Sequence, residues 1–73
     1  MSPQQRLIAN ARLRQDRAQA AMDFIRAERA KLAELPSSWV VEQKTHRLIT
    51  RMNNAIEARN QAQDERLYLE NLR

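Results

Sequence analysis

The sequence predicts an all-α fold, an antiparallel two-helix hairpin of the helical coiled-coil type that we expect to dimerise into a four-helix bundle. Three observations predict it. The 73-residue chain has no glycine and only two prolines, and helix-favouring Ala, Arg, Gln, Glu and Leu are abundant. Apolar residues recur every seven positions in both halves. The single internal break lies at Pro36, near the midpoint, so we expect one domain covering residues 1–73.

The first helix is predicted over about residues 3–35. Ser2 can cap the first free amides, Pro3 suits the first helical position, and Gln5 stands where the partner residue of a capping box belongs. No helix breaker follows before Pro36.

A turn is predicted at residues 36–38, followed by a second helix over about residues 39–73. Proline disfavours helical geometry in the residue before it, and either Ser37 or Ser38 can cap the next helix. A short connection between two long helices makes them antiparallel neighbours.

The heptad positions predict how the two helices pack. One apolar row consists of Ala11, Ala18, Ile25 and Leu32 in the first half and Val41, Leu48, Ala55, Ala62 and Leu69 in the second. Folding at Pro36 sets Leu32 opposite Val41, and the following layers match in the same register because each pair of residue numbers has the same sum. The layers change from Leu, Ile and Val near the turn to alanine on alanine toward the open end, where we expect a lone hairpin to fray.

More apolar residues occur than one neighbouring helix can cover, which predicts association with another chain. A chain of this length buries only ~60% of its unfolded surface, and isolated exposed apolar residues alone are unremarkable in any protein. We expect a homodimer, a complex with a different protein, or both. The predicted interface comprises Leu7, Ile8, Ala11, Ala18, Met22, Phe24, Ile25, Leu32, Trp39, Val41, Leu48, Ile49, Met52, Ala55, Ile56, Ala62 and Leu69.

Trp39 is the single tryptophan and lies directly after the predicted turn. We expect it to fold over Leu35 and close that end of the hairpin. The alternative is that Trp39 anchors a partner, because tryptophan is enriched among binding hot spots.

Positive charge gathers near the turn, and the chain has a net charge of +4. The functional interpretation is that this cluster binds a nucleic acid or an acidic partner. The cluster comprises Arg26, Arg29, Lys44, Arg47 and Arg51. Interspersed Asp and Glu favour an ordinary solvated helix surface instead. Arg14 and Arg59 are predicted to face each other near the apolar row, where acidic groups from another chain would be needed to balance them.

Chemistry-bearing patterns are missing from the sequence. There is no cysteine and one histidine, so we expect no metal site and no disulfide. Ser37 and Ser38 are interpreted as caps, because no base is placed to activate them. We therefore predict no catalytic residue, no cofactor, no small-molecule substrate and no enzymatic activity. No segment reaches the ~20 apolar residues of a membrane span, and a cytoplasmic protein is expected.

These patterns predict a small protein–protein interaction module, such as a regulator, inhibitor or adaptor of bacterial, phage or plasmid type. In shape alone, the predicted hairpin is similar to small phage and plasmid hairpins that dimerise into four-helix bundles, some of which bind RNA. It is also similar to small hairpin subunits that partner secretion chaperones. RNA or DNA binding and a co-chaperone role in a secretion system are therefore the alternative hypotheses.

Overall fold

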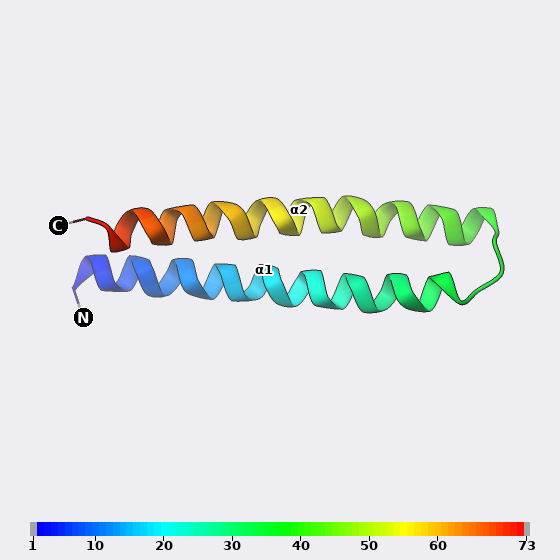
Figure 1. Ribbon diagram of the computed structural model, residues 1–73, viewed down its shortest axis with the longest axis horizontal. Helices are drawn as coiled ribbons and strands as arrows, with labels where there is room; N and C mark the ends of the chain where they lie inside the picture. Colours follow the sequence, from blue (N-terminus) through cyan, green and yellow to red (C-terminus); the bar gives the residue numbers. More distant parts are fainter. Residues whose placement is uncertain (1, 73) are drawn as a thin grey trace.

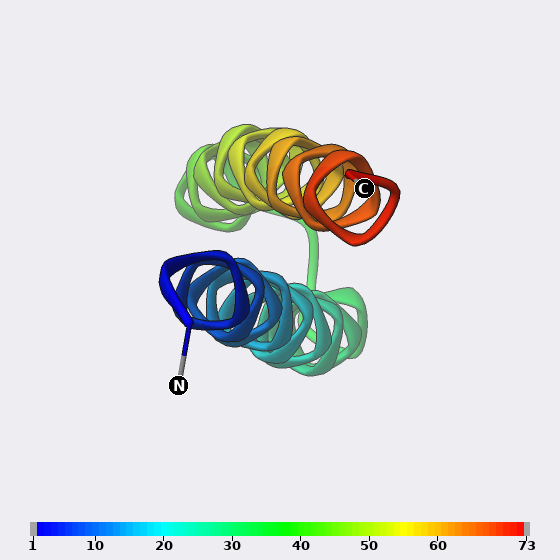
Figure 2. The same cartoon turned by 90° about the vertical axis from the view of Figure 1, so that its left-hand side faces the viewer.

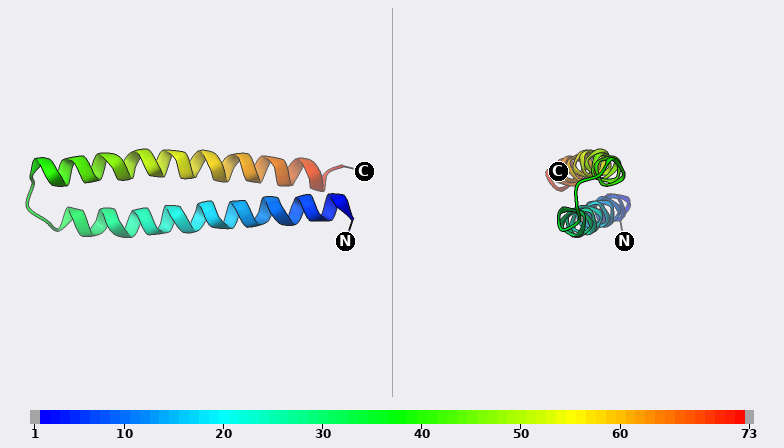
Figure 3. Two further views of the ribbon diagram at one scale, coloured as in Figure 1. Left: turned by 180° about the vertical axis from the view of Figure 1, so that it is seen from behind. Right: turned by 90° about the vertical axis from the view of Figure 1, so that its right-hand side faces the viewer.

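The computed structural model describes residues 2–72 as a hairpin of two helices, α1 (Pro3–Ala33) and α2 (Trp39–Glu70), which run antiparallel along their whole length (Figure 1). The molecule is a rod with extents of 55 × 15 × 13 Å. Both termini lie at one end and the connection at the other, as the reverse view also shows (Figure 3). The predicted all-α hairpin is confirmed.

The capping box predicted at the start of α1 is present. The Gln5 backbone N–H donates to Ser2 Oγ at 3.1 Å, and the Ser2 backbone N–H donates to Gln5 Oε1 at 3.1 Å. Pro3 occupies the first helical position, where no intrahelical hydrogen bond is required of it.

The end of α1 lies two residues earlier than predicted, at Ala33. Glu34 forms the C-cap, and the Leu35 N–H donates to the Leu32 carbonyl at 3.1 Å, which tightens the last turn. Because Pro36 disfavours helical geometry at Leu35, the connection covers residues 34–38 rather than 36–38.

The start of α2 falls at Trp39, as predicted, and Ser38 is its cap. The Val41 N–H donates to Ser38 Oγ at 3.3 Å. The helix ends at Glu70 with Asn71 as its C-cap, short of the predicted end at residue 73, which lies outside the described residues.

The predicted apolar row forms the core between the two helices. Its members are buried or half-buried in both helices: Ala11, Ala18, Ile25 and Leu32 in α1, and Val41, Leu48, Ala55, Ala62 and Leu69 in α2. The register extends one layer beyond the predicted pairs, because Gln4 Nε2 donates to the Leu69 carbonyl at 2.6 Å.

A second row of residues completes the interface between the helices. Seen end-on, the two helices are slightly inclined to one another, as expected for helices that stay in contact over many turns (Figure 2). The second row contains Ile8, Gln15 and Met22 from α1 and Thr45, Met52, Arg59 and Arg66 from α2, all of them buried or half-buried. The open half of the core is therefore partly polar, which the single apolar row did not predict.

Candidate docking surface

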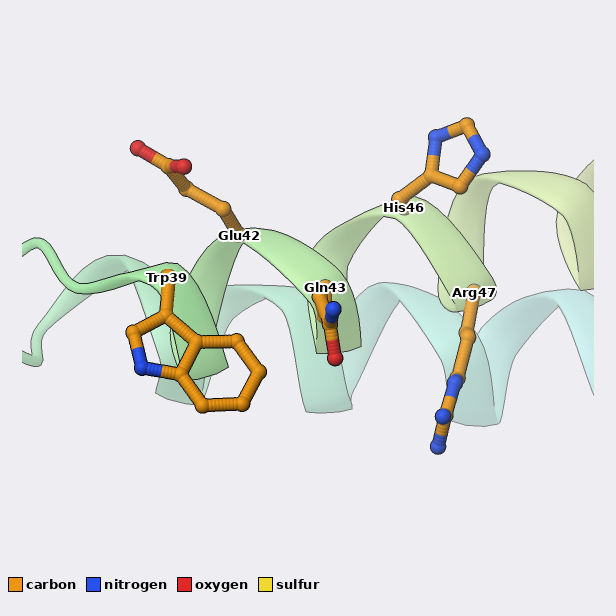
Figure 4. A pocket seen from close by; sticks show the side chains of 5 residues that line it. All are labelled: Trp39, Glu42, Gln43, His46 and Arg47. Carbon is orange, nitrogen blue, oxygen red and sulfur yellow. The ribbon is translucent and has the colours of Figure 1, made fainter.

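One surface hollow lies on the first two turns of α2 and is lined by Trp39, Glu42, Gln43, His46 and Arg47. Figure 4 shows that Trp39, Gln43 and Arg47 point to one side of the helix, whereas Glu42 and His46 point to the other. The five side chains come from a single helix and do not converge on a common point. This hollow is an open helix surface that offers no enclosed space for a reacting molecule.

The expected closure of the hairpin end by Trp39 is wrong. Trp39 is 68% exposed and Leu35 is 53% exposed, so neither shields the other from water. Val41, two residues after Trp39, is half-buried between the helices. At ~3.6 residues per turn, a position two residues away lies on nearly the opposite side of the helix, so Trp39 faces outward.

In residues 2–72, no group of three or more His, Cys, Asp or Glu side chains is arranged to hold a metal ion. Within the same range, neither helix is apolar enough over a sufficient length to cross a membrane.

The hairpin itself covers part of the predicted interface. Met22 is 2% exposed and Ile25 is 5% exposed, and Ile8, Met52 and Ile56 are half-buried. Met22 and Ile25 therefore belong to the core of one chain, whereas Ile8, Met52 and Ile56 are covered only in part.

Other apolar side chains stay open to solvent. Ten large ones are exposed, at fractions from 38% to 68%. They are Leu7, Leu67, Tyr68 and Leu72 near the open end, Leu13, Phe24 and Ile49 along the rod, and Leu35, Trp39 and Val40 near the connection.

Two further hollows lie between the helices on one side of the rod. The hollow nearer the connection is lined by Glu28, Leu32, Lys44, Arg47, Leu48 and Arg51. The hollow in the middle of the rod is lined by Arg14, Arg17, Ala18, Ala21, Asn54, Ala55, Ala58 and Gln61. The same heptad positions contribute to both hollows, so both lie on one side of the helix pair, and we call them together the basic groove.

The predicted basic cluster is divided by the fold. Lys44, Arg47 and Arg51 line the basic groove together. Arg26 and Arg29 do not line it, and Arg26 Nη1 lies 3.9 Å from Asp23 Oδ1 on its own helix.

The expected need for acidic groups from another chain at Arg14 and Arg59 does not hold for Arg14. Arg14 forms an ion pair with Glu65 of α2, so its charge is balanced within the chain. Arg59 Nη2 donates to Asn60 Oδ1 at 3.2 Å. Acidic residues from a second chain are therefore not required for Arg14.

The sequence placed Arg59 of the second core row near the apolar row but did not identify Arg66. The Nε atoms of Arg59 and Arg66 are buried and have no hydrogen-bond partner among residues 2–72. The sequence feature that identifies Arg59 and Arg66 as core residues is their heptad spacing from Thr45 and Met52, which places all four residues in one row.

Comparison with protein-family models, curated proteins and solved structures found no match.

Proposed function

We propose that the chain is a non-enzymatic protein–protein interaction module, a regulator, inhibitor or adaptor that acts through the apolar surface its own hairpin leaves uncovered. The supporting observation is the balance between exposed and buried side chains. Among residues 2–72, seven hydrophobic side chains are buried and three of these are alanines, whereas ten large hydrophobic side chains are exposed.

The physical reason is that each helix of a hairpin has only one neighbour within the chain. Covering apolar surface contributes about 25 cal/mol per Å². Large side chains such as Phe24 at 61% exposure and Leu13 at 49% exposure therefore favour a further neighbour. Their spread along the rod suits a partner that lies along the helices.

We propose a two-fold dimer as the form of this association, with two hairpins making an antiparallel four-helix bundle in the cytoplasm. Two-fold dimers are the commonest oligomers, and such bundles bury the apolar stripes of four helices at once. A different protein in place of the second copy, as for a co-chaperone subunit, is the other form of the same function.

Size-exclusion chromatography with light scattering, combined with thermal unfolding at several protein concentrations, tests this proposal. We expect the mass of a dimer and a Tm that rises with concentration, because dissociation is coupled to unfolding. A poorly folded chain that becomes ordered only with a second protein would support the heteromeric form. A sharply melting monomer that binds no other chain would refute the proposed function.

Nucleic-acid binding is a second candidate, favoured by the three cations Lys44, Arg47 and Arg51 lining one hollow. It predicts that binding to mixed single-stranded RNA weakens steeply with salt, since each neutralised phosphate releases counterions. The double substitution Arg47→Glu and Arg51→Glu should then abolish binding. Salt-independent binding, or none at low ionic strength, would exclude this candidate.

A further inference from the structure

We propose that the basic groove is a docking site for an acidic amphipathic helix of a partner protein, which lies between α1 and α2 and completes a three-helix bundle. This inference rests on the proposed interaction function and names the chemistry of one partner.

Apolar side chains line both hollows of the groove, together with the polar side chains of Asn54 and Gln61 in the middle one. Leu32 and Leu48 form the apolar floor near the connection, and four alanines form it in the middle of the rod: Ala18, Ala21, Ala55 and Ala58. Small side chains let a third helix approach the other two closely. Phe24, 61% exposed, follows Arg17 by one heptad and lies along the same edge between the two hollows. A helix with an apolar face would cover this floor.

The rim of the groove is strongly cationic. Its charged side chains are Arg14, Arg17, Lys44, Arg47 and Arg51 against the single carboxylate of Glu28. Of the five cations, only Arg14 takes part in an ion pair among residues 2–72, and Glu28 is itself paired with Lys31 at 3.3 Å. Four rim cations therefore remain for carboxylates on the partner helix.

Charge decides between the possible occupants. A second copy of the chain docked through the same groove would bring two cationic rims together, which like-charge repulsion opposes. A nucleic acid would match the rim but leave the Leu and Ala floor uncovered, and Phe24 at the edge is a single aromatic side chain, whereas single-strand binders stack successive bases on several. An acidic amphipathic helix satisfies both the floor and the rim.

A synthetic peptide can serve as the probe. The two hollows of the groove together span α1 from Arg14 to Leu32, so a helix of about 18 residues matches this length at ~1.5 Å per residue. The probe is a capped peptide of this length, monomeric alone, with Leu and Ala on one face and Glu on the flanking positions. The matched control peptide has Lys in place of every Glu.

Fluorescence anisotropy of the labelled peptides with the full chain measures binding at low and at physiological salt. We expect the Glu peptide to bind, its affinity to fall with added salt, and the Lys peptide to bind at least about tenfold more weakly. Equal binding of the two peptides would overturn the inference. So would displacement of the Glu peptide by single-stranded RNA at equal or lower concentration, which would assign the groove to nucleic acid.

Two pairs of variants locate the binding. Arg51→Glu reverses a rim charge and Ala58→Gln fills the groove, and both residues are exposed, so the hairpin should keep its helicity by circular dichroism. The matched controls are Arg6→Glu and Ala27→Gln, exposed residues of α1 that do not line the groove. We expect the groove variants alone to weaken binding about tenfold. An equal loss in the controls would overturn the inference.

Light scattering on the same samples separates this inference from the proposed function. A dimer that does not bind the Glu peptide refutes the docking site and leaves the interaction function standing. A folded monomer that binds neither peptide nor protein refutes both.

Discussion

At the residue scale, the polar members of the second core row distinguish this hairpin from an apolar coiled coil. Arg59 and Arg66 lie at heptad positions between the helices, and each has a buried Nε atom without a partner in the described part of the chain. A buried donor that is left without an acceptor costs about 1–3 kcal/mol. Such polar core residues lower stability, and in coiled coils they help to fix register and oligomeric state.

Arg59→Leu should therefore stabilise the hairpin, by about 1 kcal/mol in the free energy of unfolding, because it removes the unpaired donor and keeps an aliphatic side chain in the core. Urea unfolding measures the change, with Arg17→Leu on the exposed surface as the control. A loss of stability in Arg59→Leu alone would show that the guanidinium has an acceptor in solution.

Met22 and Phe24 provide a second residue-scale contrast. Met22 is 2% exposed and Phe24 is 61% exposed, although the sequence assigned both to an intermolecular interface. Met22→Ala should cost about 2 kcal/mol or more of unfolding free energy, because it leaves a cavity in the core. Phe24→Ala should change the stability of the dilute chain by less than about 1 kcal/mol. Similar losses in both variants would mean that Phe24 is also buried in solution.

At the scale of the helices, the caps determine where each helix begins. The sequence left Ser37 and Ser38 as equal candidates for the cap of α2, and the structure assigns this role to Ser38. The choice depends on the path of residues 34–38, which orients one hydroxyl toward the first free amides.

Ser38→Ala should cost about 1 kcal/mol of stability, whereas Ser37→Ala should have little effect, because only Ser38 accepts a hydrogen bond from the first turn of α2. Urea unfolding followed by far-ultraviolet circular dichroism compares the two variants. Equal effects would indicate that the two serines share the capping role.

The two halves of the helix pair differ in the kind of contact that joins them. Near the open end, alanine layers are supplemented by the Gln4–Leu69 hydrogen bond and by ion pairs such as Arg12–Glu70 at 2.9 Å. Exposed ion pairs contribute only about 0–1 kcal/mol each. The expected fraying of this half therefore stays a prediction.

Hydrogen–deuterium exchange of the dilute chain should show faster exchange of backbone amides around Ala11 and Ala62 than around Ile25 and Leu48. The reason is that alanine layers bury less apolar area and allow local opening at a lower free energy. Uniform protection of the backbone amides from exchange along both helices would contradict this prediction. It would indicate that a second chain covers the open half of the hairpin.

At the scale of the whole molecule, charge limits which side can face a second copy. The basic groove disfavours self-association, whereas Ile49, 38% exposed, and Ile56, half-buried, lie one heptad apart on α2 and do not line the groove. We therefore expect the homodimer interface to include this pair.

Ile49→Glu should convert the dimer into a monomer, because it places a charge in the expected apolar contact. Light scattering gives the mass, and circular dichroism checks that the helices persist. Thr50, the next residue of α2, is exposed, and the variant Thr50→Glu is the control. A dimer that persists in the Ile49→Glu variant would exclude this side of the rod as the dimer interface.

The sequence by itself determined the two helices, their antiparallel arrangement and their register. Heptad spacing fixes which side of each helix faces the other, and Pro36 fixes where the chain reverses. These features depend on backbone geometry and on the burial of regularly spaced side chains. Both can be predicted from the spacing of residues along the sequence.

Only the tertiary structure decided which exposed side chains meet across the rod. Arg14 of α1 pairs with Glu65 of α2, although the antiparallel register sets Arg14 opposite Arg59, so the length and direction of the side chains decide this ion pair. The outward direction of Trp39 and the position of Glu28 and Leu32 of α1 beside Lys44, Arg47 and Arg51 of α2 depend on how the two helices are rotated against each other. Long side chains pair with whichever opposite charge lies within reach, and the packing of the two helices sets the distances between those charges.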